Sequence, residues 1–513
     1  MTELPRLSHL QAAGLDAFEP LSPDDFYKAA AGRLKAGGRA VSYFGFSEEG
    51  APLDNSFAGI RLVMILAFDA ERRLEALSMS AGDSFRALTP DFPRLHLFER
   101  EIAEQTGLRC DGHPWLKPVR YPLKEGSPVP PGVTDFFKVH GAKVHEVAVG
   151  PVHAGVIEPG HFRFQCHGER VFHLEIALGY QHRGIERRLI GGPGKLTSHY
   201  LETLAGDTTI GHASAYCRAL ESLSGTRVPG RGEFLRAIML ELERLANHTG
   251  DLGALAGDVA YLPTASFCGR LRGDFLNMSA LICGNRFGRG MIIPGGTAFD
   301  LDPALIKELK LRLDAAFTDV GNAADLLWAS SSVMERFEGT GIVPKETALA
   351  LGMTGPAARA SGVRRDVRHD FPTGAYASKI VMAEDAPESG DVYARAYTRW
   401  LEIKHSYELI SVLLDSLPAG PVFMKPGPMK PESFTVSLEE GWRGEICHVA
   451  ATDKAGKFRH YKIKDPSFNN WQGLAMALRG AQISDFPLCN KSFNLSYCGH
   501  DLELRITDLC SKK

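Results

Sequence analysis

The feature that most constrains the fold is an amphipathic segment in the middle of the chain, from about Gly232 to Thr249. Its apolar side chains recur at steps of three and four residues, at Phe234, Leu235, Ile238, Leu242 and Leu245. This spacing predicts a helix whose apolar stripe faces a core. Two further long helices are expected at about Pro303–Glu338 and Val392–Ser416.

The composition is that of a globular protein with more than one core. The chain has 513 residues, of which 44% are hydrophobic and 23% charged. These shares are ordinary for a globular protein, and the length predicts two or more domains. The net charge of −3 argues against general binding to the phosphate backbone of nucleic acids.

Several features favour a cytoplasmic location. No uninterrupted apolar run approaches the roughly 18 residues typical of a membrane helix. The N-terminus has acidic residues and lacks the apolar core of a secretory signal. Nine cysteines occur without a CxxC pair, which favours a reducing compartment over a disulfide framework. We therefore expect the chain to reach a membrane only through partners.

Residues from about 20 to 125 are predicted to form a small α/β unit. Ser22 is suited to cap a first helix, and a second amphipathic helix starts at Leu97 and is closed by Gly107. Three apolar runs between these helices are predicted strands, namely Ala40–Phe46, Ile60–Phe68 and Leu74–Met79.

A linker is expected after this unit. The stretch Lys124–Val133, KEGSPVPPGV, is rich in proline, glycine and serine, as linkers commonly are. We place the domains at 1–125 and 147–513, with the linker at 126–146.

Two adjacent motifs in the first unit resemble a known family. The helix FEREIAEQTGL at 98–108 is followed by DGHPWLKPVRYP at 111–122. Together they resemble the small peripheral-arm subunit of complex I, often called the 30 kDa type. The resemblance implies a role in subunit contact rather than catalysis.

The second domain opens with motifs of a second family. GPVHAGVIEPGHF at 150–162 and GYQHRGIE at 179–186 resemble the start of the large subunits of membrane-bound energy-converting hydrogenases, such as formate hydrogenlyase. They also resemble the 49 kDa, quinone-site subunit of complex I. The resemblance implies an α+β fold overall. The small N-terminal α/β domain would precede a large, mainly helical domain of the nickel-iron hydrogenase large-subunit type, with antiparallel hairpins.

Two polar, glycine-containing segments, Leu201–Glu221 and Asp485–Leu502, match those that meet at the redox site of this family. A nickel-iron centre there takes four thiolates from two CxxC pairs, since soft ligands suit nickel and iron. Aligned on their neighbours, the four ligand positions carry Ala205, Thr208, Ser496 and Gly499. A methyl, a hydroxyl or a hydrogen cannot replace a thiolate. We therefore expect no nickel-iron centre and no hydrogenase activity in this chain itself.

Other metal ligands are not assigned by the sequence. Cys498 is one position out of place and Cys489 lies nine residues earlier; they are either a metal or redox remnant or buried small apolar side chains. Nine of the 18 histidines lie between His140 and His212. None has the HxxxH or HExxH spacing of a zinc site.

A quinone is the alternative cargo. In complex I, a tyrosine at the position of Gly206 and a histidine in the first hairpin loop bind the quinone head group. His153 matches that histidine, and His161 is offset by a longer loop, but Gly206 has no side chain to donate a hydrogen bond. The sequence also has neither GxGxxG nor a P-loop, so direct nucleotide binding is not supported.

The expected pocket is lined by polar side chains of the two segments and the first hairpin. Its predicted lining is His153, Glu158, His182, Arg183, Asp207, Thr208, His212, Cys489, Lys491, Cys498, His500 and Asp501. Proton transfer is assigned to Asp207, His212 and Asp501, because burial tunes such groups. The alternative is that Asp207 and His212 form a satisfied core pair.

The remaining polar side chains are assigned to an electron carrier. These are His153, Glu158, His182, Arg183, Thr208 and Lys491. The resemblance implies that Arg183 lies next to an iron-sulfur cluster of the partner subunit, where a cation would stabilise the reduced cluster. A structural salt bridge is the alternative for Arg183.

Three hypotheses for the function follow. In the first, the chain docks an iron-sulfur small subunit holding a 4Fe-4S cluster and, through it, antiporter-like membrane subunits on the inner face of the cell membrane. It would couple electron transfer to proton or cation translocation while holding no cofactor itself. In the second, it is a scaffold with a vestigial site. In the third, it reduces a quinone with altered ligands. The polar residues around Ala205 and Thr208 favour the first, because a vestigial cavity tends to fill with apolar side chains.

Overall fold

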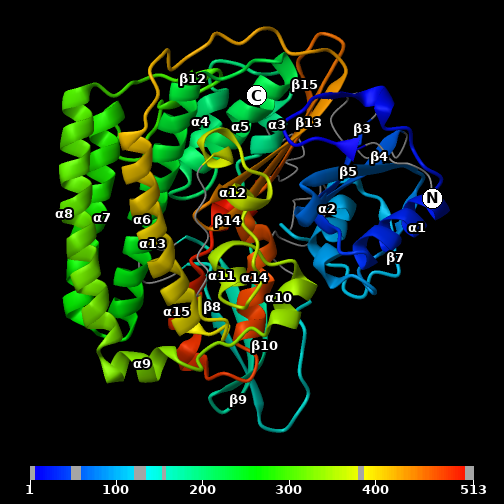
Figure 1. Cartoon of the computed structure of the whole chain (residues 1–513). Helices are drawn as coiled ribbons and strands as arrows, with labels where there is room; N and C mark the ends of the chain where they lie inside the picture. The colour runs from blue at the N-terminus through cyan, green and yellow to red at the C-terminus, as the bar shows by residue number, and fades with distance from the viewer. Residues whose placement is uncertain (1–5, 48–58, 121–134, 153–157, 379–385, 503–513) are drawn as a thin grey trace, which may run out of the picture.

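The computed structural model describes residues 6–47, 59–120, 135–152, 158–378 and 386–502. Figure 1 shows long helices on one side, a smaller unit built from the N-terminal residues on the other, and strands of the C-terminal part between them. The predicted α+β class with antiparallel sheets is confirmed. The domain boundary at residue 125 stays a prediction, since the linker lies largely outside the described residues.

The N-terminal unit is an antiparallel sheet with helices on one face. The strand order is β1-β5-β4-β3, with β1 (Arg6–Leu7), β3 (Arg39–Ser47), β4 (Ile60–Phe68) and β5 (Arg73–Ala81). The helices are α1 (Pro23–Lys35) and α2 (His96–Thr106). Both predicted helix ends are confirmed: the Ser22 hydroxyl accepts the Asp25 N–H at 3.2 Å, and Gly107 closes α2 at φ 77°. A short parallel pair, β6 (Ser84–Arg86) and β7 (Arg109–Asp111), completes the unit.

Strand β4 is buried on both faces. Leu62 and Met64 pack with the helices of the N-terminal unit. Val63 and Ile65 point to the opposite face and pack with residues of the C-terminal part of the chain. Alternate side chains of a strand point to opposite faces, so the continuous apolar run at 60–68 reflects a sheet covered on both sides.

The second sheet joins the two ends of the chain. Its order is β15-β14-β13-β2, with β2 (Ala13–Gly14), β13 (Ser433–Gly441), β14 (Gly444–Thr452) and β15 (Phe458–Lys464). The Asp453 N–H donates to the Lys457 carbonyl at 2.8 Å and closes the turn between β14 and β15. Residues at the very start of the chain therefore complete a sheet formed near its end.

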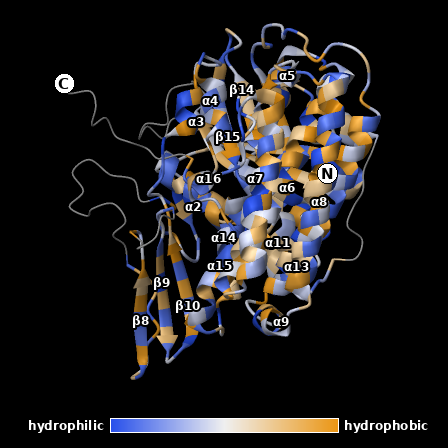
Figure 2. Ribbon diagram, turned by 90° about the vertical axis from the view of Figure 1, so that its left-hand side faces the viewer, coloured by the Kyte–Doolittle hydropathy of each residue, from blue (hydrophilic) through white to orange (hydrophobic). Residues whose placement is uncertain are grey.

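A third antiparallel sheet projects from the body, as Figure 2 shows. It consists of β8 (Val144–Val149), β9 (His161–His167) and β10 (Arg170–Ala177), and Gly168 has a positive φ of 57° in the turn between β9 and β10. No helix in the described part of the chain combines the length and the apolarity needed to cross a membrane.

In the described part of the chain, five long helices build the helical body. They are α5 (Thr209–Ser224), α6 (Gly230–Asp258), α7 (Leu262–Cys283), α8 (Pro303–Trp328) and α13 (Val392–Asp415). Helix α6 runs nine residues past its predicted end. Its Gly253 allows α7 to approach closely, because an added Cβ there would lie 2.9 Å from the Cβ of Cys268. Gly253 is thus a packing position within the helix.

The predicted helix at 303–338 is divided into two. It breaks after Trp328 and resumes as α9 (Ser331–Phe337), at three consecutive serines, whose hydroxyls compete for backbone hydrogen bonds in helices. The other elements are short, namely α3 (Ile185–Leu189), α4 (Thr197–Glu202), β11 (Ile292–Ile293), β12 (Gly296–Thr297), α10 (Lys345–Leu351), α11 (Gly355–Arg359), α12 (Val367–Asp370), α14 (Pro466–Ala477), α15 (Phe486–Phe493) and α16 (Tyr497–His500).

Candidate functional site

The two polar segments predicted to meet do meet. Ala205–Thr208 forms the turn between α4 and α5, and Ser496–Gly499 begins α16; we call these two stretches the segment junction. The Ser496 hydroxyl caps α16 by accepting the Gly499 N–H at 2.9 Å. The same hydroxyl accepts the Gly206 N–H at 3.4 Å. One side chain thus links the two segments.

Arg443 also holds the segment junction, from the turn between β13 and β14. Its guanidinium donates to the carbonyl of Gly206 at 2.6 Å, to the hydroxyl of Thr208 at 3.0 Å and to the carbonyl of Asn494 at 2.6 Å. Arg443 is 8% exposed. A buried cation bound mainly by neutral oxygens therefore lies beside the site, and it favours negative charge there.

Cys498 and Glu158 form the contact of the junction with the first hairpin. The Cys498 thiol donates to Glu158 Oε1 at 3.2 Å, and the Tyr497 N–H donates to Glu158 Oε2 at 3.2 Å. Burial, with the charge of Glu158, raises the pKa of the Cys498 thiol to about 11. The thiol therefore keeps its proton near neutral pH.

The space beside Gly499 is filled by Asp465. A Cβ added to Gly499 would lie 2.7 Å from the Asp465 carboxyl carbon and 2.9 Å from its Oδ1. Real side chains do not make such contacts, and the carboxylate is fixed because it accepts the Ser467 N–H at 2.8 Å. A cysteine at position 499 would have to displace Asp465.

Behind Asp465 lies a chain of buried polar side chains, all within 1% of full burial. Asp465 Oδ2 lies 3.0 Å from His212 Nε2, and His212 Nδ1 lies 3.1 Å from His448 Nε2. His448 Nδ1 lies 2.9 Å from the Tyr461 hydroxyl. We call Tyr461, His448, His212 and Asp465 the histidine chain. His212 is thus joined to Asp465 rather than to the Asp207 of the predicted core pair.

Asp207 itself points to the surface. Its carboxylate is 42% exposed and forms an ion pair with Arg272 at 3.3 Å. Its carbonyl accepts hydrogen bonds from Asn247 at 3.0 Å and Trp442 at 2.8 Å. The residue has a positive φ of 56°, so it shapes the turn, and burial does not supply the predicted reason for proton transfer.

A carboxyl group that the sequence did not single out lies next to this turn. Glu243, on α6, accepts the N–H groups of Ile210 at 2.7 Å and Gly211 at 3.2 Å, the first turn of α5. It lines a surface pocket with Asp207, Asn247, Arg272 and Arg286 among others. Burial raises the pKa of Glu243 to about 8, although the two N–H groups oppose the shift.

Asp501 anchors the end of the tail segment. Its buried carboxylate accepts the N–H groups of Gly179 at 2.8 Å and Gln181 at 3.0 Å. It therefore fixes the loop that leads to His182 and Arg183. Burial lowers the pKa of His182. Arg183 is exposed and donates to the carbonyls of Thr203 and Leu204 at 2.7 Å each. Among the described residues it forms no salt bridge, which was the alternative role for it.

Other predicted lining residues make their contacts elsewhere. Lys491 is 46% exposed and forms an ion pair with Asp258 at 2.5 Å. Cys489 is fully buried beside Gly341 and Arg395, as the small apolar role predicts. His500 is buried between Phe468 and Asp501. His153 lies outside the described residues.

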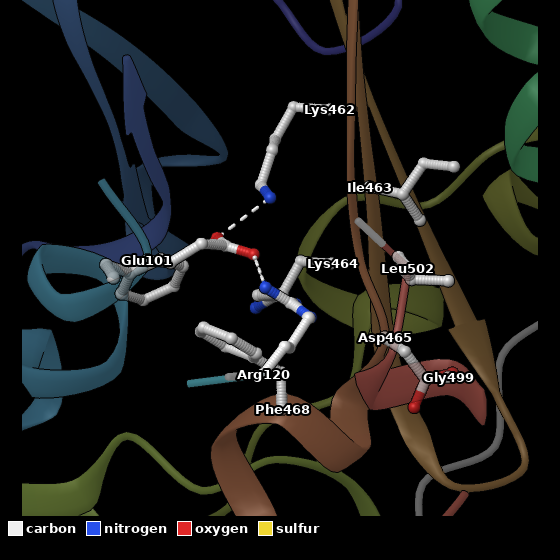
Figure 3. Close-up of a pocket in the computed structure, with 10 residues that line it drawn as sticks. Glu101, Arg120, Lys462, Ile463, Lys464, Asp465, Phe468, Gly499 and Leu502 are labelled. Atoms are coloured by element: carbon white, nitrogen blue, oxygen red, sulfur yellow. Dashed lines mark hydrogen bonds and ion pairs between the residues drawn. The ribbon is translucent and has the colours of Figure 1, made fainter. Parts of the chain in front are cut away.

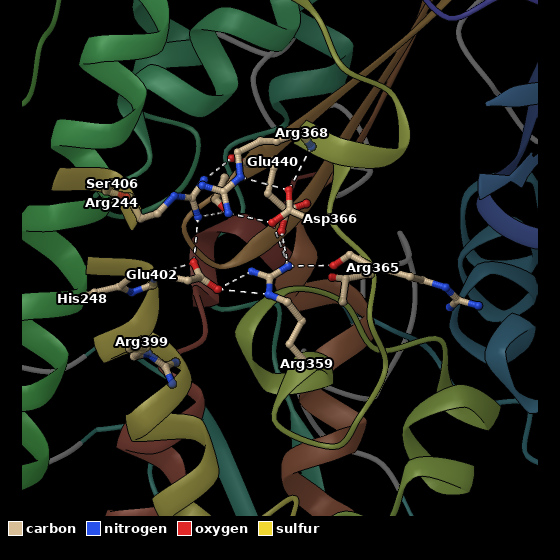
Figure 4. Close-up of polar contacts among 12 residues, drawn as sticks. Arg244, His248, Arg359, Arg365, Asp366, Arg368, Arg399, Glu402, Ser406 and Glu440 are labelled. Atoms are coloured by element: carbon tan, nitrogen blue, oxygen red, sulfur yellow. Dashed lines mark hydrogen bonds and ion pairs between the residues drawn. The ribbon is translucent and has the colours of Figure 1, made fainter. Parts of the chain in front are cut away.

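A dense cluster of charges lies between α6, α13 and the strands, and Figure 4 shows its contacts. Glu402 binds Arg359 at 2.6 Å, Arg244 at 3.2 Å and His248 at 3.0 Å. We call this the Glu402 cluster; its other members are Glu241, Asp366, Arg368 and Glu440.

The carboxylates of the Glu402 cluster are strongly shifted. Burial would raise the pKa of Glu241, but Arg244 and Arg368 lower it to about 2. Burial, with the charge of Asp366, raises the pKa of Glu440 to about 7 despite Arg359. The cluster therefore combines fixed charges with one carboxyl group that titrates near neutral pH.

A small charged pocket lies between the N-terminal unit and the C-terminal strands, as Figure 3 shows. Glu101 on α2 binds Arg120 at 2.6 Å and Lys462 on β15 at 2.8 Å. Asp465 and Gly499 line the same pocket. The histidine chain thus begins at the contact between the two parts of the molecule.

Few features of the sequence point to the central partners of the site. Arg443 lies in a strand turn, and His448 and Tyr461 lie within strands that read as core. Asp465 could have been found, since Asp465-Pro466 is a helix start, but its direction could not. Within the described residues, no three histidine, cysteine, aspartate or glutamate side chains are grouped so as to hold a metal ion.

The chain was compared with known families and structures. Residues 258–433 match the family described as respiratory-chain NADH dehydrogenase, 49 Kd subunit. The carbon monoxide-induced hydrogenase of Rhodospirillum rubrum is 31% identical over 68% of this chain and 97% of its own. Formate hydrogenlyase subunit 5 of Escherichia coli is 28% identical over 84% of this chain and 79% of its own.

A solved structure has the same fold. It is a chain of the membrane-bound sulfane sulfur reductase, an archaeal respiratory membrane complex, with a TM-score of 0.66 at 23% identity. The match covers 70% of this chain and 98% of that one. The chain belongs to the family of the complex I 49 kDa subunit and the related hydrogenase large subunits.

Proposed function

We propose that this chain is the hydrogenase-like subunit of a membrane-associated, energy-converting oxidoreductase complex and holds no nickel-iron centre of its own. It docks an iron-sulfur small subunit that carries a 4Fe-4S cluster, and through it antiporter-like membrane subunits on the inner face of the cell membrane. Its segment junction couples electron transfer to proton or cation translocation. Residues 1–125 act as the 30 kDa-like part of the same chain.

The observation that carries this proposal is the contact between Gly499 and Asp465. A nickel-iron centre needs a thiolate at position 499, and an added Cβ there would lie 2.7 Å from the Asp465 carboxyl carbon. At the other ligand positions stand Ala205, Thr208 and Ser496, and the Ser496 hydroxyl is already used as a helix cap. This set of side chains does not fit a metal that prefers soft ligands.

Retained polar groups support proton coupling over a vestigial role. The histidine chain is buried and hydrogen-bonded throughout. Buried polar groups are costly compared with apolar side chains of the same volume. An abandoned cavity is therefore expected to lose them. The exposed Arg183, held against the turn at 203–204, is suited to face the cluster of the small subunit.

Metal analysis tests the proposal. The protein is purified together with its natural partners, and nickel and iron are counted per copy of this chain. We expect iron without nickel, with the same iron count in a Cys498→Ser variant. Near-stoichiometric nickel would overturn the proposal and restore a hydrogenase with Cys498 among its ligands.

A quinone is the second candidate for the electron carrier. Among the described residues, a Cβ added to Gly206 would meet Glu158 Oε1 alone, at 3.8 Å, so a bound group can approach the turn at this position. In this case the purified complex would oxidise a reduced electron donor only when a quinone is added. Oxidation that is independent of quinone rejects this candidate.

A further inference from the structure

The histidine chain has one consistent set of hydrogen positions when both imidazoles are neutral. Asp465 is anionic, because the His212 N–H, Arg443 and the Ser467 N–H lower the pKa of its carboxyl group against the effect of burial. His212 therefore carries its proton on Nε2 and donates it to Asp465. Its Nδ1 is then an acceptor, and His448 must donate from Nε2.

The same logic extends to Tyr461. With its proton on Nε2, neutral His448 has a bare Nδ1, and the Tyr461 hydroxyl must donate to it at 2.9 Å. Burial raises the pKa of Tyr461 far above its ordinary range, so the hydroxyl keeps its proton. All hydrogen bonds then point one way, from Tyr461 towards Asp465.

We propose that the His212–His448 pair stores one proton for the segment junction, with Asp465 as its counter-charge and Tyr461 as the group that switches from donor to acceptor. This inference rests on the proposed proton-coupling function. In the loaded form one proton, taken from water, is added to His448 Nδ1. No bond other than N–H and O–H is formed or broken, and release returns the proton to water.

The charges around the pair suit such a store. Asp465 faces the pair from the start of α14, and Arg443, in the turn before β14, acts on the Asp465 carboxylate. The other titratable neighbours are Tyr216 and Cys217 on α5 and Cys447 on β14, which keep their protons because burial raises their pKa values. With Asp465 as its only ionised member, the histidine chain changes from a net charge of −1 to neutral when the proton is loaded.

Burial and His212 lower the pKa of His448 well below its ordinary value. The empty form is therefore the resting form, and the proton is held only while the junction gains negative charge, for example when a bound carrier is reduced. The histidine chain ends next to the segment junction, since Asp465 is in contact with Gly499. A change of charge at the junction therefore acts directly on the Asp465 carboxylate, which is the counter-charge of the stored proton.

Nuclear magnetic resonance of the full-length chain with ¹⁵N-labelled imidazoles tests the inference. The resonances of the pair are assigned as those that move in a Tyr461→Phe variant and do not move in Tyr43→Phe. Tyr43 is a matched control, because it is buried and its hydroxyl has no hydrogen-bond partner among the residues that the structure describes. We expect both imidazoles of the pair to be Nε2–H tautomers at neutral pH.

Variants that weaken the loaded form sharpen the test. Tyr461→Phe removes the acceptor of the added proton, and should lower the pH at which the pair titrates by roughly one unit, since a hydrogen bond to a charged group is stronger than to a neutral one. Asp465→Asn removes the counter-charge and should lower it further, while asparagine still caps α14. An Nδ1–H tautomer of His448, or titration unchanged in both variants, overturns the inference.

The outcome is separable from that of the proposed function. The tautomers are measured in the isolated chain, without a substrate or a partner. Nickel in the purified complex would overturn the proposed function and leave the tautomers as they are. A wrong tautomer would overturn the proton store and leave the metal count unchanged.

Discussion

The Glu402 cluster and the segment junction are both polar and largely buried, but they are balanced in opposite ways. In the cluster, each of Glu241, Asp366 and Glu402 is matched by guanidinium groups at 2.6–3.2 Å. At the junction, Arg443 is bound mainly by carbonyl and hydroxyl oxygens. Matched charges fix a structure, whereas a cation that is bound mainly by neutral oxygens leaves room for an added negative charge. The difference places structural rigidity in the cluster and chemistry at the junction.

The largest expected effect on stability comes from removing one charged side chain of the Glu402 cluster. Arg359→Met removes the partner of Glu402, Glu440 and Asp366 and leaves buried carboxylates uncompensated. It should cost about 3–5 kcal/mol of stability, seen as a lower midpoint of urea unfolding. Arg364→Met is the control, because its ion pair with Glu388 is exposed and contributes less than about 1 kcal/mol. Equal effects would show that the cluster is not matched as described.

Acid should weaken the cluster more than the junction. The folded-state pKa values of Glu241 and Asp366 are lowered to about 2, because nearby arginines outweigh burial. Their contribution to stability is complete above about pH 4.5 and is lost as pH falls towards 2. Unfolding monitored by circular dichroism should therefore show a steep loss in this range. In Glu241→Gln the loss of stability with falling pH should be less steep. In Glu308→Gln, at an exposed position, the loss should be the same as in the natural chain.

Glu243 should show the opposite dependence on pH. Its folded-state pKa is raised to about 8 by burial, so its contribution is complete below about pH 4.5 and is lost as pH rises through 8. Glu243→Gln should gain about 1–2 kcal/mol over the natural chain at pH 9. Glu233→Gln, on the same helix, is the control, because Arg218 lowers the pKa of Glu233 despite burial. A loss of stability in Glu243→Gln at pH 9 would contradict the prediction.

The smallest effect on stability is expected at the junction. Cys498→Ser should change the free energy of unfolding by less than about 1 kcal/mol, since the thiol makes only weak hydrogen bonds. With a pKa raised to about 11, the folded thiol should react with iodoacetamide at pH 8 roughly 100-fold more slowly than in the urea-unfolded chain. Alkylation mapped by mass spectrometry measures both rates. Equal rates would mean that Cys498 is not held by Glu158.

The sequence predicts the helices that surround the site better than it predicts the contacts at the centre of the site. The helical stripe on α6 and the helix ends at Ser22 and Gly107 follow from local patterns, and the structure has them. The meeting of Ala205–Thr208 with Ser496–Gly499 came from resemblance, since nothing local links residues so far apart. Arg443 and Asp465 could not be placed, because what they touch depends on how one sheet packs against α5 and against the segments at 205–208 and 494–499.

The pairing of β2 with β13 has a consequence for how the protein is made. One face of the N-terminal sheet, with Val63 and Ile65, packs on residues 434–451. Ala13–Gly14 can pair in its sheet only after residues 433–434 have been synthesised. At 5–20 residues per second, that apolar face stays uncovered on the ribosome for roughly 20–80 s. This early part of the chain therefore completes its packing late. A chaperone that shields its apolar face during this interval should raise the yield of folded protein.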